Sequence, residues 1–286
     1  MKRSKPLVLG IPSSILETEP SLREKTLKTS LVLRAAAIFR VDEIIIYNDG
    51  TISEESHTRY SRLIKKIHRY LTTPPYLRKK LVPLDNDLKY IGIAPPLRLH
   101  VFDVGKHPSN GEYRIGVVVE SKRKYMLVDA GLKNHVKTFC EQECPSVNEL
   151  VVINIVSINP LKAIYDKKFE ETIYLGPSIR DSNIINSIKD YRAKGYYLIA
   201  TSRKGRIVDI KTLRVLSKKL TSYKGVYVLF GGPYAGLYEI FSSMGFDLDE
   251  LVDLVVNTIP CQGTKTVRTE EAIYASLALL NIVLKE

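Results

Sequence analysis

Two segments near the carboxyl end of the chain decide its fold: Leu229-Phe-Gly-Gly-Pro-Tyr-Ala-Gly236 and Asn257-Thr-Ile-Pro-Cys-Gln-Gly-Thr-Lys-Thr-Val-Arg-Thr-Glu-Glu-Ala272. Each follows a short apolar, β-branched run, at Val226–Phe230 and Leu251–Val256, that is typical of a buried strand. Glycine and proline then predict a sharp turn before a helix resumes. Open α/β sheets hold small ligands at such turns, where glycine lets the backbone approach the ligand. The sequence therefore predicts a ligand pocket at this end of the chain.

The pattern outside the middle of the chain predicts an α/β protein. At the amino end a strand, a helix and a second strand follow one another, which indicates a parallel unit with a right-handed crossover. Ser21 with Glu24 three residues later predicts a capping box at the start of the first helix. The expected strands are 6–11, 44–47, 196–201, 226–230 and 251–256, and the expected helices are 21–40, 60–71, 182–193 and 210–220.

The pattern changes at Ile93-Ala-Pro-Pro96, where short β-like runs separated by turns replace the helical periodicity. We expect strands over 97–104, 113–120, 125–129 and 150–158, which suggest a small OB-like barrel with a nucleic-acid-binding surface. The chain would then divide into residues 1–92, the first half of an α/β domain; 93–176, the barrel insert; and 177–286, the second half of the α/β domain.

Basic side chains gather in two places. The hairpin tip Ser121-Lys-Arg-Lys124 presents Lys122, Arg123 and Lys124, and the expected helix 60–71 carries Lys65 and Lys66. A solvated face and an RNA-binding face explain these clusters equally well. The whole chain has 286 residues and a formal net charge of +12, which favours a polyanionic partner such as nucleic acid.

Composition also excludes several classes of protein. We expect no secretory signal and no membrane span, since the longest apolar runs fall far below the ~18 residues that a spanning helix needs, and hence a cytoplasmic protein. The three cysteines and five histidines form no ligand-spaced cluster, so we expect no metal site. Cys140 and Cys144 are interpreted as half-buried thiols, and Cys261 as a small packing residue.

At this point the residues resemble a known family. The turn after Phe230 together with Ile259-Pro-x-x-Gly and Val267-Arg-Thr-Glu-Glu-Ala272 looks like the cofactor end of the SPOUT class of RNA methyltransferases. The segment 29–46 is similar to the first motif of SpoU-type members, although the asparagine usual near Thr29 or Ser30 is missing. The whole chain, with its β-rich insert, is most similar to the archaeal and eukaryotic SPOUT branch.

The resemblance implies a parallel sheet with helices on both faces, a deep trefoil knot, a homodimer and S-adenosylmethionine as the cofactor. It also implies that three successive strand ends meet at the cofactor, with backbone groups binding its adenine and ribose. The last helix would help to build the dimer. The cofactor-binding residues implied are Thr201, Ser202, Gly205, Phe230, Gly231, Gly232, Gly236, Ile259, Gln262, Gly263, Thr266, Val267 and Ala272.

Arg34 is the predicted catalytic residue. Leu27, Leu31, Ala35 and Ile38 are expected to form the buried face of the first helix, and Arg34 falls almost on that face. Arginine is rarely buried without a partner. Its guanidinium would hold a phosphate or assist deprotonation in the pocket; the alternative is a structural ion pair with Asp42 or a carboxylate near the carboxyl end.

Two kinds of function remain open at this stage. The first is methylation of RNA, with ribosomal RNA favoured as the substrate. Similarity of Val267–Ala272 to the RsmE group, which methylates uridine at N3, favours a base nitrogen, whereas the SpoU-like Arg34 suits a ribose 2′-hydroxyl. The second is a non-catalytic RNA-binding factor in ribosome assembly that keeps the fold.

Overall fold

The computed structural model describes residues 1–284. Two compact units are present, and each gathers segments that are far apart in the sequence. The barrel unit consists of residues 1–2, 69–84 and 98–175, and the sheet unit consists of residues 3–68 and 85–97 and of the chain from Gly176 onward.

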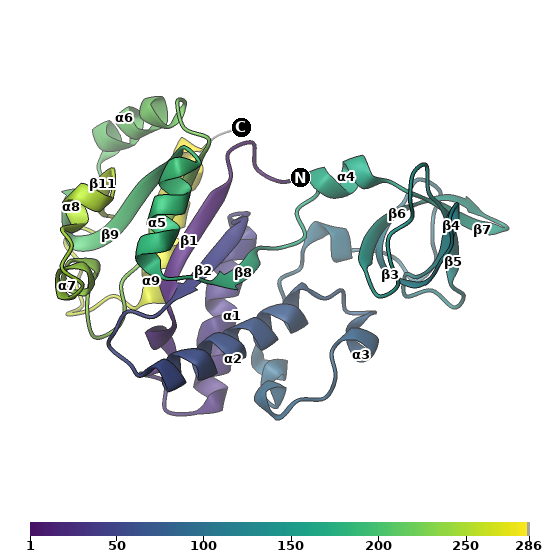
Figure 1. The fold of residues 1–286 in the computed structure, drawn as a ribbon, viewed down its shortest axis with the longest axis horizontal. Helices are drawn as coiled ribbons and strands as arrows, with labels where there is room; N and C mark the ends of the chain where they lie inside the picture. Colours follow the sequence, from purple (N-terminus) through teal and green to yellow (C-terminus); the bar gives the residue numbers. More distant parts are fainter. Residues whose placement is uncertain (285–286) are drawn as a thin grey trace. The chain divides into compact units, whose positions relative to one another are not determined.

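The sheet unit contains a parallel sheet, which confirms the predicted α/β class (Figure 1). Within the described residues it has six strands in the order β11-β9-β10-β1-β2-β8, and every neighbouring pair is parallel. The central strands are continuous apolar runs because helices cover both of their faces. The strands are β1 (Leu7–Pro12), β2 (Glu43–Tyr47), β8 (Ser178–Asp181), β9 (Tyr196–Ile207), β10 (Gly225–Leu229) and β11 (Leu254–Asn257).

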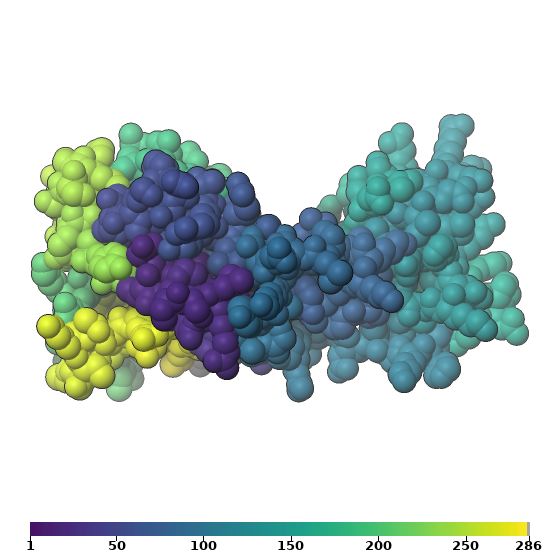
Figure 2. Space-filling model, turned by 90° about the horizontal axis from the view of Figure 1, so that it is seen from below, coloured from purple at the N-terminus to yellow at the C-terminus, as the bar shows by residue number. Residues whose placement is uncertain are grey.

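Helices flank the sheet on its two faces, with α5 in front and α1 and α9 behind in the view of Figure 1. The core on the α5 face includes Tyr47, Tyr227 and Leu229 from the strands and Phe241 from α7. On the other side α9 lies against α1, and Figure 2 shows the purple N-terminal part of the sheet unit beside the yellow C-terminal part. The helices are α1 (Leu22–Ile38), α2 (Glu54–Thr72), α5 (Ile184–Ala193), α6 (Ile210–Leu220), α7 (Leu237–Ser243), α8 (Leu248–Leu251) and α9 (Thr269–Val283).

Helix α1 begins as predicted but turns a different face inward. The Ser21 hydroxyl accepts from the backbone N–H of Arg23 at 3.2 Å, which confirms the N-cap. The predicted buried face is right for Ala35, which is fully buried, and wrong for Leu27 and Ile38, which are 41% and 49% exposed. The helix also buries Val32 and Leu33, together with polar side chains of which Thr26, Lys28 and Ser30 have hydrogen-bond partners. Apolar spacing alone does not reveal this combination.

The barrel unit contains a closed barrel with the strand order β3-β4-β5-β7-β6, which confirms the predicted small barrel. Three expected strands are present, but the expected strand 97–104 is wrong: that segment contains only the 3-10 turn His100–Phe102. Sequence reasoning missed β5 and β7 because both are short and carry exposed lysines. The barrel strands are β3 (Tyr113–Ser121), β4 (Tyr125–Asp129), β5 (Val136–Phe139), β6 (Leu150–Ile158) and β7 (Leu161–Tyr165).

The remaining helices of the barrel unit are short, namely α3 (Arg78–Leu81) and α4 (Lys167–Thr172). No helix among the described residues has the length and apolar character needed to cross a bilayer.

The cysteines differ from their interpretation. Cys140 and Cys144, expected as thiols, are joined by a disulfide in the loop that follows β5. Cys261, expected to pack in the interior, is exposed and has a φ of 55°. Two cysteines four residues apart can be free thiols or can form a disulfide, so the spacing alone does not decide between the two states.

Candidate active site

A cavity of about 580 Å³ lies where β10 and β11 end, beside residues 201–204 in the middle of β9. Because β9 pairs with both β10 and β11, these three segments lie next to one another in the sheet. The volume is in the range of small-molecule sites. Most of the predicted cofactor residues line this cavity, namely Thr201, Ser202, Phe230, Gly231, Gly232, Gly236, Ile259, Gln262, Thr266, Val267 and Ala272.

Two predicted cofactor residues, Gly205 and Gly263, do not line the cavity. The expected turn 201–205 lies instead inside strand β9, where the pairing with β11 jumps from Ala200 to Arg206. A Cβ on Gly205 would stand 2.7 Å from backbone atoms of Val256, so this glycine lets two strands approach each other.

Gly232 lets the loop after β10 lie close to the side chains of Asp49 and Ser14 behind the cavity. A Cβ at this position would lie 2.3 Å from Oδ2 of Asp49 and 2.8 Å from Oγ of Ser14. The Ser14 hydroxyl donates to Asp49 at 2.5 Å, and the Asp49 carboxylate is buried. A side chain at Gly232 would therefore disturb this buried pair as well as the cavity wall.

Sequence reasoning missed several polar residues of the cavity wall. Lys28 and Thr18 come from the other end of the chain, and Lys204 and Arg268 lie beside predicted residues. Lys28 is only 5% exposed although it lies in the middle of a helix. A buried lysine needs a charged partner, but the sequence alone does not show that Lys28 is buried.

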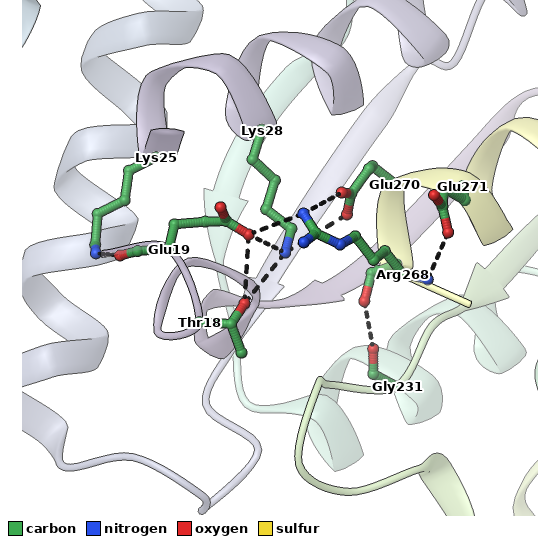
Figure 3. A network of polar contacts seen from close by, with 9 residues as sticks. Thr18, Glu19, Lys25, Lys28, Gly231, Arg268, Glu270 and Glu271 are labelled. Atoms are coloured by element: carbon green, nitrogen blue, oxygen red, sulfur yellow. Dashed lines mark hydrogen bonds and ion pairs between the residues drawn. The ribbon is translucent and has the colours of Figure 1, made fainter. Parts of the chain in front are cut away.

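Lys28 is the centre of a charged network that joins the segment before α1 to the start of α9 (Figure 3). Its Nζ lies 2.9 Å from Oε1 of Glu19 and 3.6 Å from Oε2 of Glu270, and both glutamates are buried. Arg268 reaches the same carboxylates from the rim, with Nη1 3.4 Å from Glu19 and 3.8 Å from Glu270. The Arg268 side chain itself is 61% exposed.

The network changes the acidity of Glu19. Burial alone would raise the pKa of its carboxyl, but the hydrogen bond and charge of Lys28, with a contribution from Arg268, hold that pKa below its ordinary value of 4.5. Glu19 is therefore an ionised carboxylate at neutral pH. Glu19 and Glu270 together hold Arg268 at the cavity rim.

Helix α9 begins with a capping contact. Arg268 occupies the N-cap, and its backbone N–H donates to Oε2 of Glu271 at 2.8 Å. The Thr269 hydroxyl instead donates to the carbonyl of Gly231 at 3.2 Å. This bond connects the first turn of α9 to the loop after β10, two elements that both border the cavity.

Arg34, the predicted catalytic residue, does not line the cavity of this chain. It is half-buried, and its Nη1 donates to the carbonyl of Pro96 at 3.0 Å and to that of Leu97. Both acceptors are neutral carbonyls; an ion pair with Glu286 at the carboxyl end, one form of the alternative, lies outside the described residues.

The predicted RNA-binding lysines of α2 are already paired with carboxylates. Lys65 contacts Asp181, and Lys66 lies 2.7 Å from Asp85 and 2.6 Å from Asp87. The hydrogen bonds that Lys66 donates to these two aspartates raise its pKa. Their charges are thus balanced locally, which reduces what they offer to a polyanion.

The hairpin tip of the barrel is more open. Residues 122–124 form the turn between β3 and β4, with the Lys122 N–H donating to the Tyr125 carbonyl at 2.9 Å. Lys122 pairs with Glu120 at 2.9 Å, an exposed contact of little energetic weight. Within residues 1–284 no carboxylate lies at ion-pair distance from Arg123 or Lys124, and no metal-binding group of His, Cys, Asp and Glu is present.

The fold and the cavity define the class of the protein. A parallel α/β sheet with a cavity at the carboxyl ends of neighbouring strands, lined by glycine-bearing turns, is a small-ligand site of α/β proteins. Lys204 and Arg268 also lie on its wall, each beside carboxylates.

Residues 7–280 match the protein family described as "Putative RNA methyltransferase", and the chain belongs to this family. A human 28S rRNA (uridine-N(3))-methyltransferase is 30% identical over 309 residues, which cover 97% of this chain and 79% of the human protein. An uncharacterized protein of Halobacterium salinarum is 29% identical over 295 residues, covering 95% of this chain and 97% of that protein.

Among solved structures, a "putative methyltransferase" of Legionella pneumophila in complex with S-adenosylmethionine covers 98% of this chain and 67% of its own, with 12% identity and a TM-score of 0.38. That score is too low to establish a common fold. Family membership makes the chain an RNA methyltransferase, and the methyl donor of the family is S-adenosylmethionine.

Proposed function

We propose that this protein transfers a methyl group from S-adenosylmethionine to N3 of a uridine in ribosomal RNA. The observation that carries the proposal is the similarity of nearly the whole chain to uridine-N3 methyltransferases of 28S rRNA, including the human and Drosophila melanogaster enzymes. The same similarity favours the base nitrogen over the ribose 2′-hydroxyl. It also favours an enzyme over an assembly factor that only binds RNA.

The cavity suits the proposed donor. Its wall contains turns with exposed backbone groups, at Gly231 and Gly236. It also contains the apolar side chains of Phe230, Ile259 and Val267. Such a surface offers amides and carbonyls to a nucleoside and apolar contact to its base. When bound, the donor supplies an electrophilic methyl group on a sulfonium, and the protein supplies alignment of the attacking nitrogen.

Uridine N3 carries a proton that must leave as the nitrogen attacks. The resulting negative charge spreads over the two carbonyl oxygens of the base, so donors aimed at those oxygens lower the barrier. We assign this role to Arg268, whose exposed guanidinium lines the cavity and is anchored by Glu19 and Glu270. Its planar set of donors suits a base edge.

A homodimer with a knotted cofactor end, as in SPOUT enzymes, is part of the proposal. Apolar side chains are exposed on three helices of one layer, in which α9 contacts both α1 and α6. A second copy covering them would remove this surface from water. These residues are Leu27 and Ile38 of α1, Ile210 and Val215 of α6, and Ile282 of α9. We further propose that the barrel is an OB-like RNA-binding insert and that the reaction takes place in the cytoplasm.

Arg34 keeps a catalytic role in this proposal through the dimer. Leu27, Arg34 and Ile38 lie seven and four residues apart, so they share one stripe of α1 that borders the proposed interface. We expect Arg34→Ala to preserve the fold and cofactor affinity but to lower methyl transfer by about 100-fold, the size typical of losing one charge-stabilising donor.

The matched variant is Arg34→Lys, which keeps the charge but loses the planar fork and should restore little activity. Methyl transfer is measured with the tritium-labelled donor, and unfolding is followed by circular dichroism. Full turnover in both variants would remove Arg34 from the reaction.

The hairpin tip is expected to contact the RNA backbone. Replacing Lys122, Arg123 and Lys124 together by alanine should weaken RNA binding and reduce the slope of log K against log salt by about 2, the value for three single-strand phosphate contacts. Fluorescence anisotropy at several salt concentrations measures the slope. An unchanged slope would show that the tip does not touch phosphates.

A gene deletion tests the proposed substrate in the cell. Nucleosides from ribosomal RNA of the deletion strain should lack 3-methyluridine at one position, and a plasmid copy should restore it. An N3 methyl group blocks base pairing, so the position also appears as a stop in reverse transcription of wild-type RNA. Unchanged 3-methyluridine with loss of a 2′-O-methylated nucleoside would instead support the ribose as the target.

A further inference from the structure

The outer surface of the barrel carries an aromatic row beside a basic row. In the strand pairing Tyr125 of β4 lies opposite Phe139 of β5, and Phe139 lies opposite Ile164 of β7. Directly cross-strand residues point to the same face of a sheet. Their neighbours Met126, Thr138 and Ala163 are fully buried inside the barrel, so the row Tyr125–Phe139–Ile164 faces outward. We call this row, with its flanking lysines, the aromatic face.

Lysines surround the rings of the aromatic face. Lys137 precedes Phe139 by two residues on β5, and its Nζ lies 4.5 Å from the centroid of the Tyr125 ring and 5.6 Å from that of Phe139. Lys122 approaches the Tyr125 ring from the hairpin tip, at 5.7 Å. Lys162, opposite Lys137 in the pairing with β7, adds a third exposed ammonium.

The aromatic face presents apolar side chains and ammonium groups together at the surface. Phe139 and Ile164 are each 39% exposed, and Tyr125 is half-buried. Exposed rings cost free energy in water, while flat rings next to ammonium groups match what a nucleotide presents, namely a flat base and a negative phosphate. A protein that bound this face in the same way would need a flat side chain on each ring and a carboxylate near each ammonium group.

We propose that the aromatic face binds an unpaired segment of the RNA substrate by stacking bases on Tyr125 and Phe139. Lys122, Lys137 and Lys162 then contact the neighbouring phosphates. A duplex cannot use the rings, because its bases are stacked on one another. The proposal rests on RNA as the substrate, but it assigns a binding mode that neither the family nor the cavity specifies.

The test uses the full chain and a fluorescein-labelled oligouridine of about 12 nucleotides, a length within single-strand site sizes. Tyr125→Ala with Phe139→Ala should weaken binding by about 25-fold or more, since each stacked base contributes at least about 5-fold. The salt slope should stay unchanged, because no cation is removed. Lys122→Ala with Lys137→Ala should instead reduce that slope by about 1.4.

Matched controls separate stacking from other effects. Tyr125→Phe keeps the ring and should bind like the wild type. Tyr70→Ala removes another tyrosine of the barrel unit that has a cationic neighbour, Arg78 at 4.6 Å, but lies outside the face, and should change little. Lys167→Ala with Lys168→Ala removes two exposed charges elsewhere in the barrel unit and should reduce the slope less than the paired lysines of the face.

The outcomes are distinct. The double variant Tyr125→Ala with Phe139→Ala could unfold at a lower temperature than the wild type. In that case Tyr125→Leu with Phe139→Leu, which keeps apolar volume without an aromatic ring, must still weaken RNA binding. Wild-type RNA affinity in both aromatic double variants would overturn the proposal. An equal loss of affinity for the single strand and for its duplex with oligoadenosine would also overturn it. Donor binding by calorimetry and methyl transfer at saturating RNA report on the proposed function separately, so loss of one does not imply loss of the other.

Discussion

Replacing Ala272 by phenylalanine is expected to weaken binding of S-adenosylmethionine by about 100-fold, measured by titration calorimetry. Ala272 lies in the first turn of α9 and lines the cavity, so a ring at this position occupies the volume that the donor needs. Overfilling a packed site costs about 1–3 kcal/mol, which corresponds to roughly 5- to 150-fold in affinity. The fold should survive, because the new side chain enters a cavity instead of a filled core.

Ala193→Phe is the matched control for this variant. Ala193 is also a helical alanine, but it is exposed at the end of α5 and does not line the cavity. It should bind the donor like the wild type. Undiminished donor binding by Ala272→Phe would place the cofactor outside this cavity. This pair is a cleaner test than a substitution at Gly232, which would also disturb the buried Ser14–Asp49 contact.

Lys28→Met is expected to destabilise the protein by about 3–5 kcal/mol, because it leaves the buried carboxylates of Glu19 and Glu270 without their central cation. Urea unfolding followed by circular dichroism measures the free energy. Adding Glu19→Gln and Glu270→Gln to the same variant should recover most of the loss, since the uncompensated charges are then gone.

Lys204→Met is the matched control. Lys204 also lines the cavity and pairs with a glutamate, Glu239 at 2.7 Å, but both side chains are more than half exposed. Its removal should change the free energy of unfolding by at most about 1 kcal/mol. Equal effects of the two lysine variants would show that the buried network does not stabilise the fold.

The same network predicts a pH dependence with a defined sign. The pKa of Glu19 is lowered in the folded protein, so its contribution to stability is present above the ordinary value of 4.5 and is lost as pH falls through the lower folded value. The difference in unfolding free energy between the wild type and Lys28→Met should therefore shrink below about pH 4.5.

Sequence reasoning was most successful where chemistry is local. Glycine- and proline-bearing turns after apolar strands predicted a ligand pocket at this end of the chain, and the family resemblance implied the eleven predicted residues that line it. Ser21 marked the start of α1 for the same local reason, its hydroxyl being the cap. The short strands β5 and β7 were missed because four or five residues carry too little periodicity.

Contacts between distant segments were beyond that reasoning. Lys28, Glu19 and Glu270 meet only because α1 and α9 pack together, and Lys28 alone looks like a solvated lysine in a helix. The predicted inward face of α1 was partly wrong for the same reason. The helix faces the core with buried polar residues such as Lys28, and Leu27 and Ile38 are exposed. Arg34 therefore points toward the carbonyls of Pro96 and Leu97.

Incubation of the purified protein with S-adenosylmethionine and ribosomal RNA from a deletion strain tests the central claim most directly. The RNA is then digested to nucleosides and analysed by mass spectrometry with authentic 3-methyluridine and 2′-O-methyluridine as standards. We predict one new methyl group per RNA, eluting as 3-methyluridine, and none with the Ala272→Phe protein. A methyl group on the ribose, or no transfer by a protein that binds both donor and RNA, would contradict the account.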